Sequence, residues 1–371
     1  MSELEPGNSN NIEVPSSDGD DSRVVRRLAG GAIDLSGLSA PRRRSAETGV
    51  GLMTYNSAEM ADVALLHDLL GVVEANLNRH NAKRKGWEAH KLIPYSEGRN
   101  YDGPLGGEAW APDQSKLSDV AQFAMILNLL TEDNLPSYHH VIRTLFGHEG
   151  PWGEWVGQWT AEEANHSVAI REYLVVTRGV DPSALETARI AQMTQGYDGG
   201  GKDILHTIAY VTMQEMATNV AHRNTGKACN DPVAFRILGH IAGDERLHMK
   251  FYSNLVTAAF ELEPDRMMRA IADEVIGFKM PGSNMAGFSD MANEIAIAGI
   301  YDLFNHHYEV VEPTLATWNV YDRTDLSGDG ERAREELLAH MAMAKKRAET
   351  FNRLRPRFAA TLAARKAATN S

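Results

Sequence analysis

Apolar residues recur at three- and four-residue intervals along most of the chain from residue 57 onward, with polar residues between them. This spacing places the apolar side chains on one face of an α-helix. No stretch shows the sustained two-residue alternation of a half-buried strand. The pattern therefore predicts an all-α fold, with long helices over residues 57–79, 115–146, 150–178, 202–224 and 232–262.

Turn-forming residues divide these helices. Asp181 and Asp231 each precede a proline. An aspartate at the N-cap followed by a proline at the first helical position is typical of the start of a helix. The helix after Asp181 should be short and end before Gly196. Further helices are expected over residues 264–278 and 290–308, and a terminal helix with a basic end should begin near residue 329.

Two segments do not follow the helical pattern. Residues 85–112 are rich in Gly and Pro and are expected to form a linker between helices. Residues 1–50 are rich in Ser, Asn, Gly and Pro and poor in aromatics, which predicts a disordered tail. We therefore expect one helical domain over residues 51–371.

Composition and charge exclude several classes of protein. The 37 basic and 50 acidic residues give a net charge of −13, which argues against a nucleic-acid binder. The single cysteine, Cys229, excludes an intramolecular disulfide framework and a thiolate-rich metal site. No apolar run approaches the roughly 18 residues of a membrane span. The acidic N-terminus resembles neither a secretory signal nor a transit peptide, so a cytoplasmic location is expected.

The candidate chemistry begins with two Glu-x-x-His segments, Glu163 to His166 and Glu245 to His248. Residues three apart share one face of a helix, so each segment presents a carboxylate and an imidazole together. One such segment is expected by chance. Two copies become informative because each lies about 30 residues after another glutamate.

These preceding glutamates are Glu132 and Glu215, and both lie within apolar stretches of predicted helices. A buried carboxylate is costly unless a cation compensates it. Four glutamates and two histidines on four helices match the ligand pattern of di-iron and di-manganese bundle proteins. Taken singly, Glu163 and Glu245 are also compatible with exposed helix charges, but that alternative does not explain six residues at matched spacing.

Three neighbouring residues add detail to this predicted centre. Glu162 and Asp244 each precede a ligand glutamate and are candidates to accept the second N–H of the opposite histidine. An exposed acid is the alternative for Glu162. Pro136 should kink the helix over residues 115–146 beside Glu132, because proline has no N–H for the carbonyl of that residue.

Four phrases in order resemble the soluble acyl-acyl carrier protein desaturases, the stearoyl type and its actinobacterial relatives. They are TEDNLPSY at 131–138, WTAEEANH at 159–166, QEMAT at 214–218 and GDERLH at 243–248. The family's typical forms are TEEALPTY, WTAEENRH, QERAT and DEKRH. The resemblance implies a ferritin-like helical bundle, usually homodimeric, with two iron ions per chain. It implies dioxygen-dependent insertion of a cis double bond into an acyl chain on acyl carrier protein, with electrons from ferredoxin.

The resemblance also assigns roles to individual residues. It makes Thr218 the active-site threonine, Trp87 the tryptophan near the electron-transfer path and Tyr138 the aromatic residue near the acyl channel. Asp133 departs from the family's motif without removing a ligand. The family's metal ligands fall on Glu132, Glu163, His166, Glu215, Glu245 and His248.

The substrate and the partners give the last predictions. Val141, Thr144 and Leu145 follow Pro136 and are candidates to line an acyl channel, with plain core packing as the alternative. Acyl carrier protein is acidic, so docking requires a local basic patch on this acidic chain. The best patch is Arg79, Lys83, Arg84 and Lys85, and a weaker one is Lys345, Lys346, Arg347, Arg353, Arg355 and Arg357.

Chain length, double-bond position and electron donor are left open by the sequence. Two other functions also stay open. One is a different di-iron oxidase or hydroxylase acting on a carrier-bound substrate. The other is a non-catalytic ferritin-like protein that binds iron.

Overall fold

The computed structural model describes residues 57–197, 199–279 and 288–369. Within these ranges the regular elements are helices, and the one isolated bridge joins Tyr101 to Glu108. The all-α prediction is therefore confirmed. The expected tail over residues 1–50 lies outside the described residues.

Among the described residues, four helices form the core of a bundle: α3 (Asp119–Glu132), α5 (Gly150–Val176), α7 (Ile204–Ala228) and α8 (Pro232–Leu262). The flanking helices are α1 (Ser57–Asp68), α2 (Leu70–Lys83), α4 (Leu135–Phe146), α6 (Pro182–Gln195), α9 (Pro264–Ile276), α10 (Phe288–Ile297), α11 (Leu303–Asn305), α12 (Glu312–Thr317) and α13 (Gly328–Thr369). Short turns are η2 (Ala89–Lys91), η3 (Tyr95–Glu97) and η4 (Pro112–Gln114), and η5 (His306–Val311) is a π-helix.

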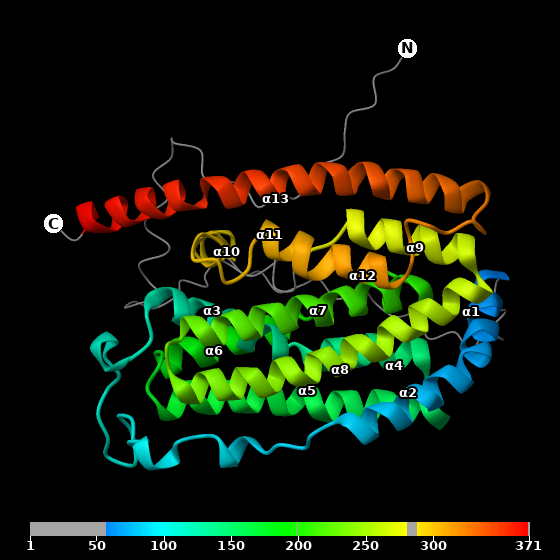
Figure 1. Cartoon of the computed structure of the whole chain (residues 1–371). Coiled ribbons are helices and arrows are strands. Elements are labelled where there is room, and N and C mark those ends of the chain that lie inside the picture. The colour runs from blue at the N-terminus through cyan, green and yellow to red at the C-terminus, as the bar shows by residue number, and fades with distance from the viewer. Residues whose placement is uncertain (1–56, 198, 280–287, 370–371) are drawn as a thin grey trace, which may run out of the picture.

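The core helices lie side by side in one half of the molecule (Figure 1). Helix α7 packs against α8 and α3, and α5 packs against α3 and α8, so the four helices enclose a common interior. The long α13 runs across the other half and packs against α9 and α11. Side chains that point inward from all four core helices therefore meet in one place.

The predicted helix over residues 115–146 is two helices, not one kinked helix. Helix α3 ends at Glu132, Asp133 and Asn134 form a turn, and α4 starts at Leu135. Pro136 has no N–H to donate to the carbonyl of Glu132, so the helical hydrogen-bond ladder is interrupted at this point. The break places Glu132 at the very end of its helix.

A second predicted helix, over residues 290–308, is also divided. Gly299 adopts a positive φ of 73° after the end of α10. Its N–H and that of Ile300 donate to the carbonyls of Ala296 and Ile295, a helix-ending pattern that favours glycine. The Asp302 carboxylate then caps the next helix. The helix over residues 57–79 is likewise split, at Leu69.

The predicted N-caps are present. The Asp231 carboxylate accepts the N–H groups of Val233 and Ala234 at 2.9 and 2.8 Å. Asp181 accepts those of Ser183 and Ala184 in the same way at the start of α6. These bonds satisfy donors that a helix start otherwise leaves without partners.

Aromatic packing fixes α5 against α8. The fully buried Trp155 stacks on Phe251, with ring centroids 3.6 Å apart and planes 5° apart. The indole N–H of Trp318 donates to Ser253 at 3.0 Å and ties the segment after α12 to α8.

Cys229 is buried, and its burial raises the pKa of the thiol to about 12. None of the helices in the described ranges is both long and apolar enough to span a bilayer.

The capping geometry gives a stability prediction. Asp231→Ala should lower the free energy of unfolding by about 1 kcal/mol, because two N–H groups at the start of α8 lose their acceptor. Asp231→Asn should retain most of the stability. Urea unfolding followed by circular dichroism measures both. Asp102→Ala changes an exposed linker residue and serves as the control. Equal effects of Asp231→Ala and Asp102→Ala would contradict the capping role.

Candidate metal centre

The four core helices bring six candidate ligands into one buried cluster. Helix α3 supplies one glutamate at its end, α7 supplies another, and α5 and α8 each supply a glutamate and a histidine. Each of these side chains belongs to a residue that is at most 7% exposed. They are Glu132, Glu163, His166, Glu215, Glu245 and His248.

The donor atoms form two overlapping groups of four. In each group, the ligand atoms lie within 4.8 Å of one another. Glu132 and His166 belong to the first group, Glu215 and His248 belong to the second, and Glu163 and Glu245 belong to both. The cluster can therefore hold two neighbouring cations, each with one imidazole, one carboxylate of its own and two shared carboxylates.

Two buried atoms in this cluster have no hydrogen-bond partner. They are Glu163 Oε1 and His248 Nδ1, which face each other at 2.8 Å. Folded proteins seldom leave buried polar atoms in this state, so the pair points to a ligand between the helices. Four carboxylates with two imidazoles suit iron or manganese, and the described residues add no thiolate that would favour zinc.

The electrostatics of the cluster favour a cation. Burial, together with the neighbouring charges of Glu245 and Glu163, raises the pKa of Glu215 well above its ordinary value. Burial also opposes ionisation of Glu132, but hydrogen bonds from His166 and His222 outweigh it and lower the pKa of that carboxyl. The four carboxylates therefore do not all ionise readily unless further positive charge lies among them.

The two histidines are held by acids from opposite motifs. His248 Nε2 lies 2.9 Å from Glu162 Oε2, and His166 Nε2 lies 3.3 Å from Asp244 Oδ2. When each Nε2 donates its proton to the carboxylate, each Nδ1 keeps its lone pair toward the cluster. Glu162 is thus engaged with the centre and is not an exposed acid.

Trp87 connects the linker to this centre. Its indole N–H donates to Asp244 Oδ2 at 2.6 Å. Its ring stacks on His166, with centroids 6.2 Å apart and planes 6° apart, and His240 stacks on Trp87 at 5.5 Å. A continuous series of rings therefore runs from His166 to the half-buried His240.

Sequence reasoning missed three histidines around the centre. His222 Nε2 lies 2.8 Å from Glu132 Oε1, and His80 Nε2 lies 3.0 Å from Glu162 Oε2. The third is His240. His222 follows Thr218 by four residues and so shares its helix face, which was a usable signal. His80 lies one residue past the predicted end of its helix, so no spacing argument reached it.

Thr218 lies beside the cluster on α7. Its hydroxyl donates to Glu245 Oε2 at 2.9 Å and also lies 3.1 Å from the backbone carbonyls of Gln214 and Glu215. Thr218 lines a small cavity next to the four carboxylates. The hydroxyl is therefore close to both the candidate ligands and an open space.

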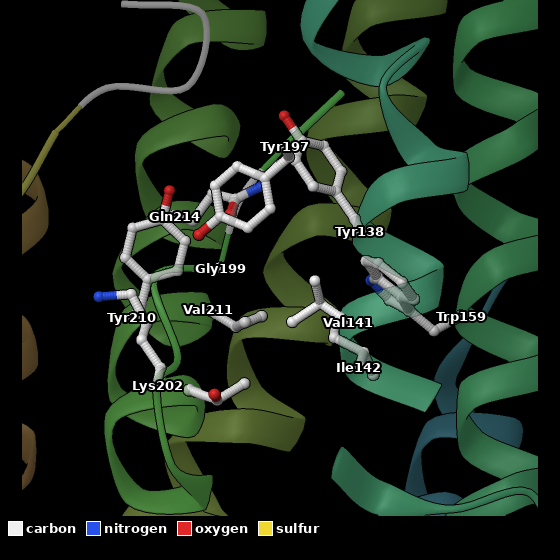
Figure 2. A pocket seen from close by; sticks show the side chains of 11 residues that line it. Tyr138, Val141, Ile142, Trp159, Tyr197, Gly199, Lys202, Tyr210, Val211 and Gln214 are labelled. Carbon is white, nitrogen blue, oxygen red and sulfur yellow. The ribbon is translucent and has the colours of Figure 1, made fainter. Parts of the chain in front are cut away.

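A second cavity continues from the first. Tyr138, Trp159 and Gln214 line both cavities, so the two meet at these side chains. Trp159 also donates its indole N–H to Glu215 at 3.1 Å. The other walls of the second cavity are Val141, Ile142, Tyr197, Gly199, Lys202, Thr207, Tyr210 and Val211 (Figure 2).

Two of the four residues predicted to line an acyl channel border the second cavity. Tyr138 and Val141 line the cavity, whereas Thr144 and Leu145 do not. Thr144 is exposed, with its hydroxyl donating to the carbonyl of His140. Leu145 lies one turn beyond the cavity and packs against the apolar core. Ile142 takes the place expected for them.

The four residues of the predicted basic patch differ in exposure and pairing. Lys83 and Lys85 are exposed. Arg79 is half-buried and donates to Asn76, and Arg84 Nη1 lies 2.9 Å from Glu162 Oε1. Arg84 is exposed, and its charge is shared with Glu162 at the centre. In the weaker patch, Arg355 is similarly paired with Asp302 at 2.9 Å.

The fold and the centre define a ferritin-like bundle of the kind that holds two metal ions between four helices. A fatty acid desaturase family model matches residues 61–366, and the chain belongs to this family. DesA1 of Mycobacterium tuberculosis, which carries the name of an acyl-[acyl-carrier-protein] desaturase, is 48% identical over 289 residues, covering 76% of this chain and 85% of DesA1.

Two further relatives agree with this assignment. The chloroplastic stearoyl-[acyl-carrier-protein] 9-desaturase 6 of Arabidopsis thaliana is 30% identical over 238 residues, covering 60% of this chain and 61% of that protein. The X-ray structure of DesA2 from Mycobacterium tuberculosis H37Rv superposes with a TM-score of 0.60 at 32% identity. It covers 70% of this chain and 96% of DesA2. The ferritin-like fold expected from the resemblance is confirmed.

Glu163 and Glu245 belong to both donor groups, and this gives a test of the ligand assignment. Glu163→Gln should reduce bound iron more than Glu132→Gln, because Glu163 belongs to both donor groups and Glu132 to one. Iron per chain after reconstitution, measured by mass spectrometry, checks this order. Glu154→Gln changes an exposed glutamate of the same helix and should bind as much iron as the unmodified protein. Equal iron in Glu163→Gln and Glu154→Gln would refute the ligand assignment.

Proposed function

We propose that this protein is an acyl-[acyl carrier protein] desaturase with a di-iron centre. It inserts a cis double bond into a carrier-bound acyl chain, using dioxygen and electrons from ferredoxin. The single observation that carries the proposal is the paired carboxylate–imidazole cluster that borders a narrow cavity between α4 and α7. The named relatives support it.

The chemistry requires a strong oxidant beside a well-positioned chain. An internal methylene has no acidic proton and no leaving group, so acid–base groups alone cannot remove its hydrogens. Two iron ions bound by the six ligands supply the oxidising power that dioxygen chemistry needs. In the balanced reaction the chain loses two hydrogens, two electrons and two protons enter, and dioxygen leaves as two waters.

The residues of this chain position the substrate. Tyr138 and Trp159 stand where the cavity meets the carboxylates, so an acyl chain in the cavity passes these rings next to the centre. Thr218 can hold or pass a proton at Oγ1, because this atom already donates to Glu245. We assign Thr218 this proton-handling role.

Electrons are proposed to enter on the imidazole side. Trp87 contacts His166 by stacking and Asp244 by hydrogen bonding, and His240 extends the stack outward. Lys83 and Lys85 lie just before Trp87 in the chain. These two lysines are proposed to dock the acidic carrier, with an acidic electron donor as the competing occupant. The homodimer and the cytoplasmic location stay predictions.

The direct test offers acyl carriers to the iron-loaded protein. Myristoyl, palmitoyl and stearoyl carriers would be incubated with ferredoxin, its reductase, NADPH and oxygen, and products identified by mass spectrometry. We expect the loss of two hydrogens from one chain length. Addition of one oxygen atom would instead identify a hydroxylase. Full iron loading without any product would favour the non-catalytic alternative.

Charge reversal tests the docking patch. Lys83→Glu/Lys85→Glu should raise the KM for the acyl carrier about tenfold, because it places like charges against an acidic partner. Iron content should not change. Lys345→Glu/Lys346→Glu reverses the same charge in the weaker patch on α13, so comparing the two variants shows which patch docks the carrier. A raised KM for ferredoxin alone would assign the patch to the electron donor.

A further inference from the structure

The second cavity runs along α7 away from the centre. Gln214 lines it next to Glu215, and Thr207 lines it seven residues earlier, about 10 Å along the helix axis. Lys202 lies beyond Thr207, just before α7 begins. Figure 2 shows Lys202 and Tyr210 on one side of this cavity, with Val141 and Ile142 facing them from α4. The end of the cavity furthest from the centre is therefore at Lys202.

A buried ion pair lies at this end of the cavity. Lys202 Nζ lies 2.6 and 2.8 Å from the two carboxylate oxygens of Glu274 on α9. The Glu274 side chain is 7% exposed, and the Lys202 side chain is 28% exposed. The ammonium also lies 5.3 Å from the ring centre of Tyr210, another wall of the cavity. Lys202 thus lies at the wall of the cavity, with its ammonium held by Glu274.

An ion pair resists displacement by an alkyl chain more strongly than apolar side chains do. Aliphatic side chains can shift to admit extra methylenes at modest cost. Displacing Lys202 would instead leave Glu274 as a buried carboxylate without its cation, which is a heavy penalty. Burial already raises the pKa of Glu274 even with Lys202 beside it.

We propose that the Lys202–Glu274 ion pair is the end wall of the acyl cavity and sets a sharp upper limit on the length of chain that fits beyond the metal centre. This inference rests on the proposed function. It takes this end of the cavity to hold the methyl end of the acyl chain, away from the carrier.

The neighbouring backbone offers a second, opposite change. A Cβ added at Gly199 would lie 3.0 Å from Val141 Cγ1, which is a tight contact across the cavity. Gly199→Ala should therefore narrow the same end and shorten the chain that fits. Removing the ion pair should therefore increase the longest acyl chain that fits, whereas adding a methyl group at Gly199 should decrease it.

The main variant is Lys202→Met/Glu274→Met, which removes both charges and keeps similar side-chain lengths. The matched control is Lys366→Met/Glu294→Met. That pair has an Nζ–Oε2 distance of 2.7 Å and a Glu294 side chain that is 10% exposed, and it borders neither cavity described above. Lys202→Arg retains the charge and should retain the length limit.

Two readouts are needed. The first is kcat/KM for myristoyl, palmitoyl, stearoyl, arachidoyl and behenoyl carriers. The second is the Kd of the same carriers, measured by titration calorimetry without an electron donor. We expect the double variant to raise both kcat/KM and affinity about tenfold for the first chain beyond the limit of the unmodified protein. Gly199→Ala should lower the limit, and the control should leave it unchanged.

The possible outcomes distinguish a failure of the end-wall inference from a failure of the proposed function. An unshifted length profile in the double variant, with the unmodified protein active, would overturn the end-wall assignment alone. An equal loss at every length with normal iron content would also overturn it, since the pair would then be structural. If the unmodified protein neither bound nor converted a carrier of any length, both proposals would fall together.

Discussion

The structure depends on keeping four carboxylates together in a buried helical interior. Each glutamate loses its hydration on burial, and each repels the others across a few ångströms. Two imidazoles reduce this cost but do not remove it, as the raised pKa of Glu215 shows. Bound cations would offset the negative charge that remains. The positions of α3, α5, α7 and α8 follow from this requirement, because each helix must present its ligand at the same point.

The same requirement extends outward through hydrogen bonds. Glu162 accepts from His248 and His80 and pairs with Arg84. Burial opposes its ionisation, but the hydrogen bonds from His248, His80 and Gln158 outweigh burial and hold the pKa of Glu162 far below its usual range. Asp244 similarly joins His166 to Trp87. The end of α2 and the start of the linker are thus attached to the centre, which gives an irregular segment a fixed place.

Sequence spacing could predict the ligands because their geometry is local. Residues three apart on a helix share a face whatever surrounds them, and the repeated motif supplied the rest. The contacts of His222 with Glu132 and of Arg84 with Glu162 join residues about 80 to 90 positions apart, so they depend on how helices pack. The packing of the helices likewise determines that Ile142, and not Thr144, lines the cavity. Pro136 signalled a disturbance, but whether the helix bends or breaks depends on the turn at Asp133 and Asn134.

The repeated Glu and Glu-x-x-His pattern gives the centre a nearly symmetric set of candidate ligands. The residues around the centre nevertheless differ between its carboxylate side and its histidine side. The cavity beside the centre is lined by all four ligand glutamates and by Thr218, and neither ligand histidine reaches it. The histidines turn instead toward Asp244 and Glu162, on the side where Trp87 stacks. Under the proposed function, a substrate in the cavity therefore approaches carboxylates, while the aromatic stack approaches an imidazole. Because the side chains that line the two cavities differ from those of the aromatic stack, changes in the cavity walls would leave the stack in place.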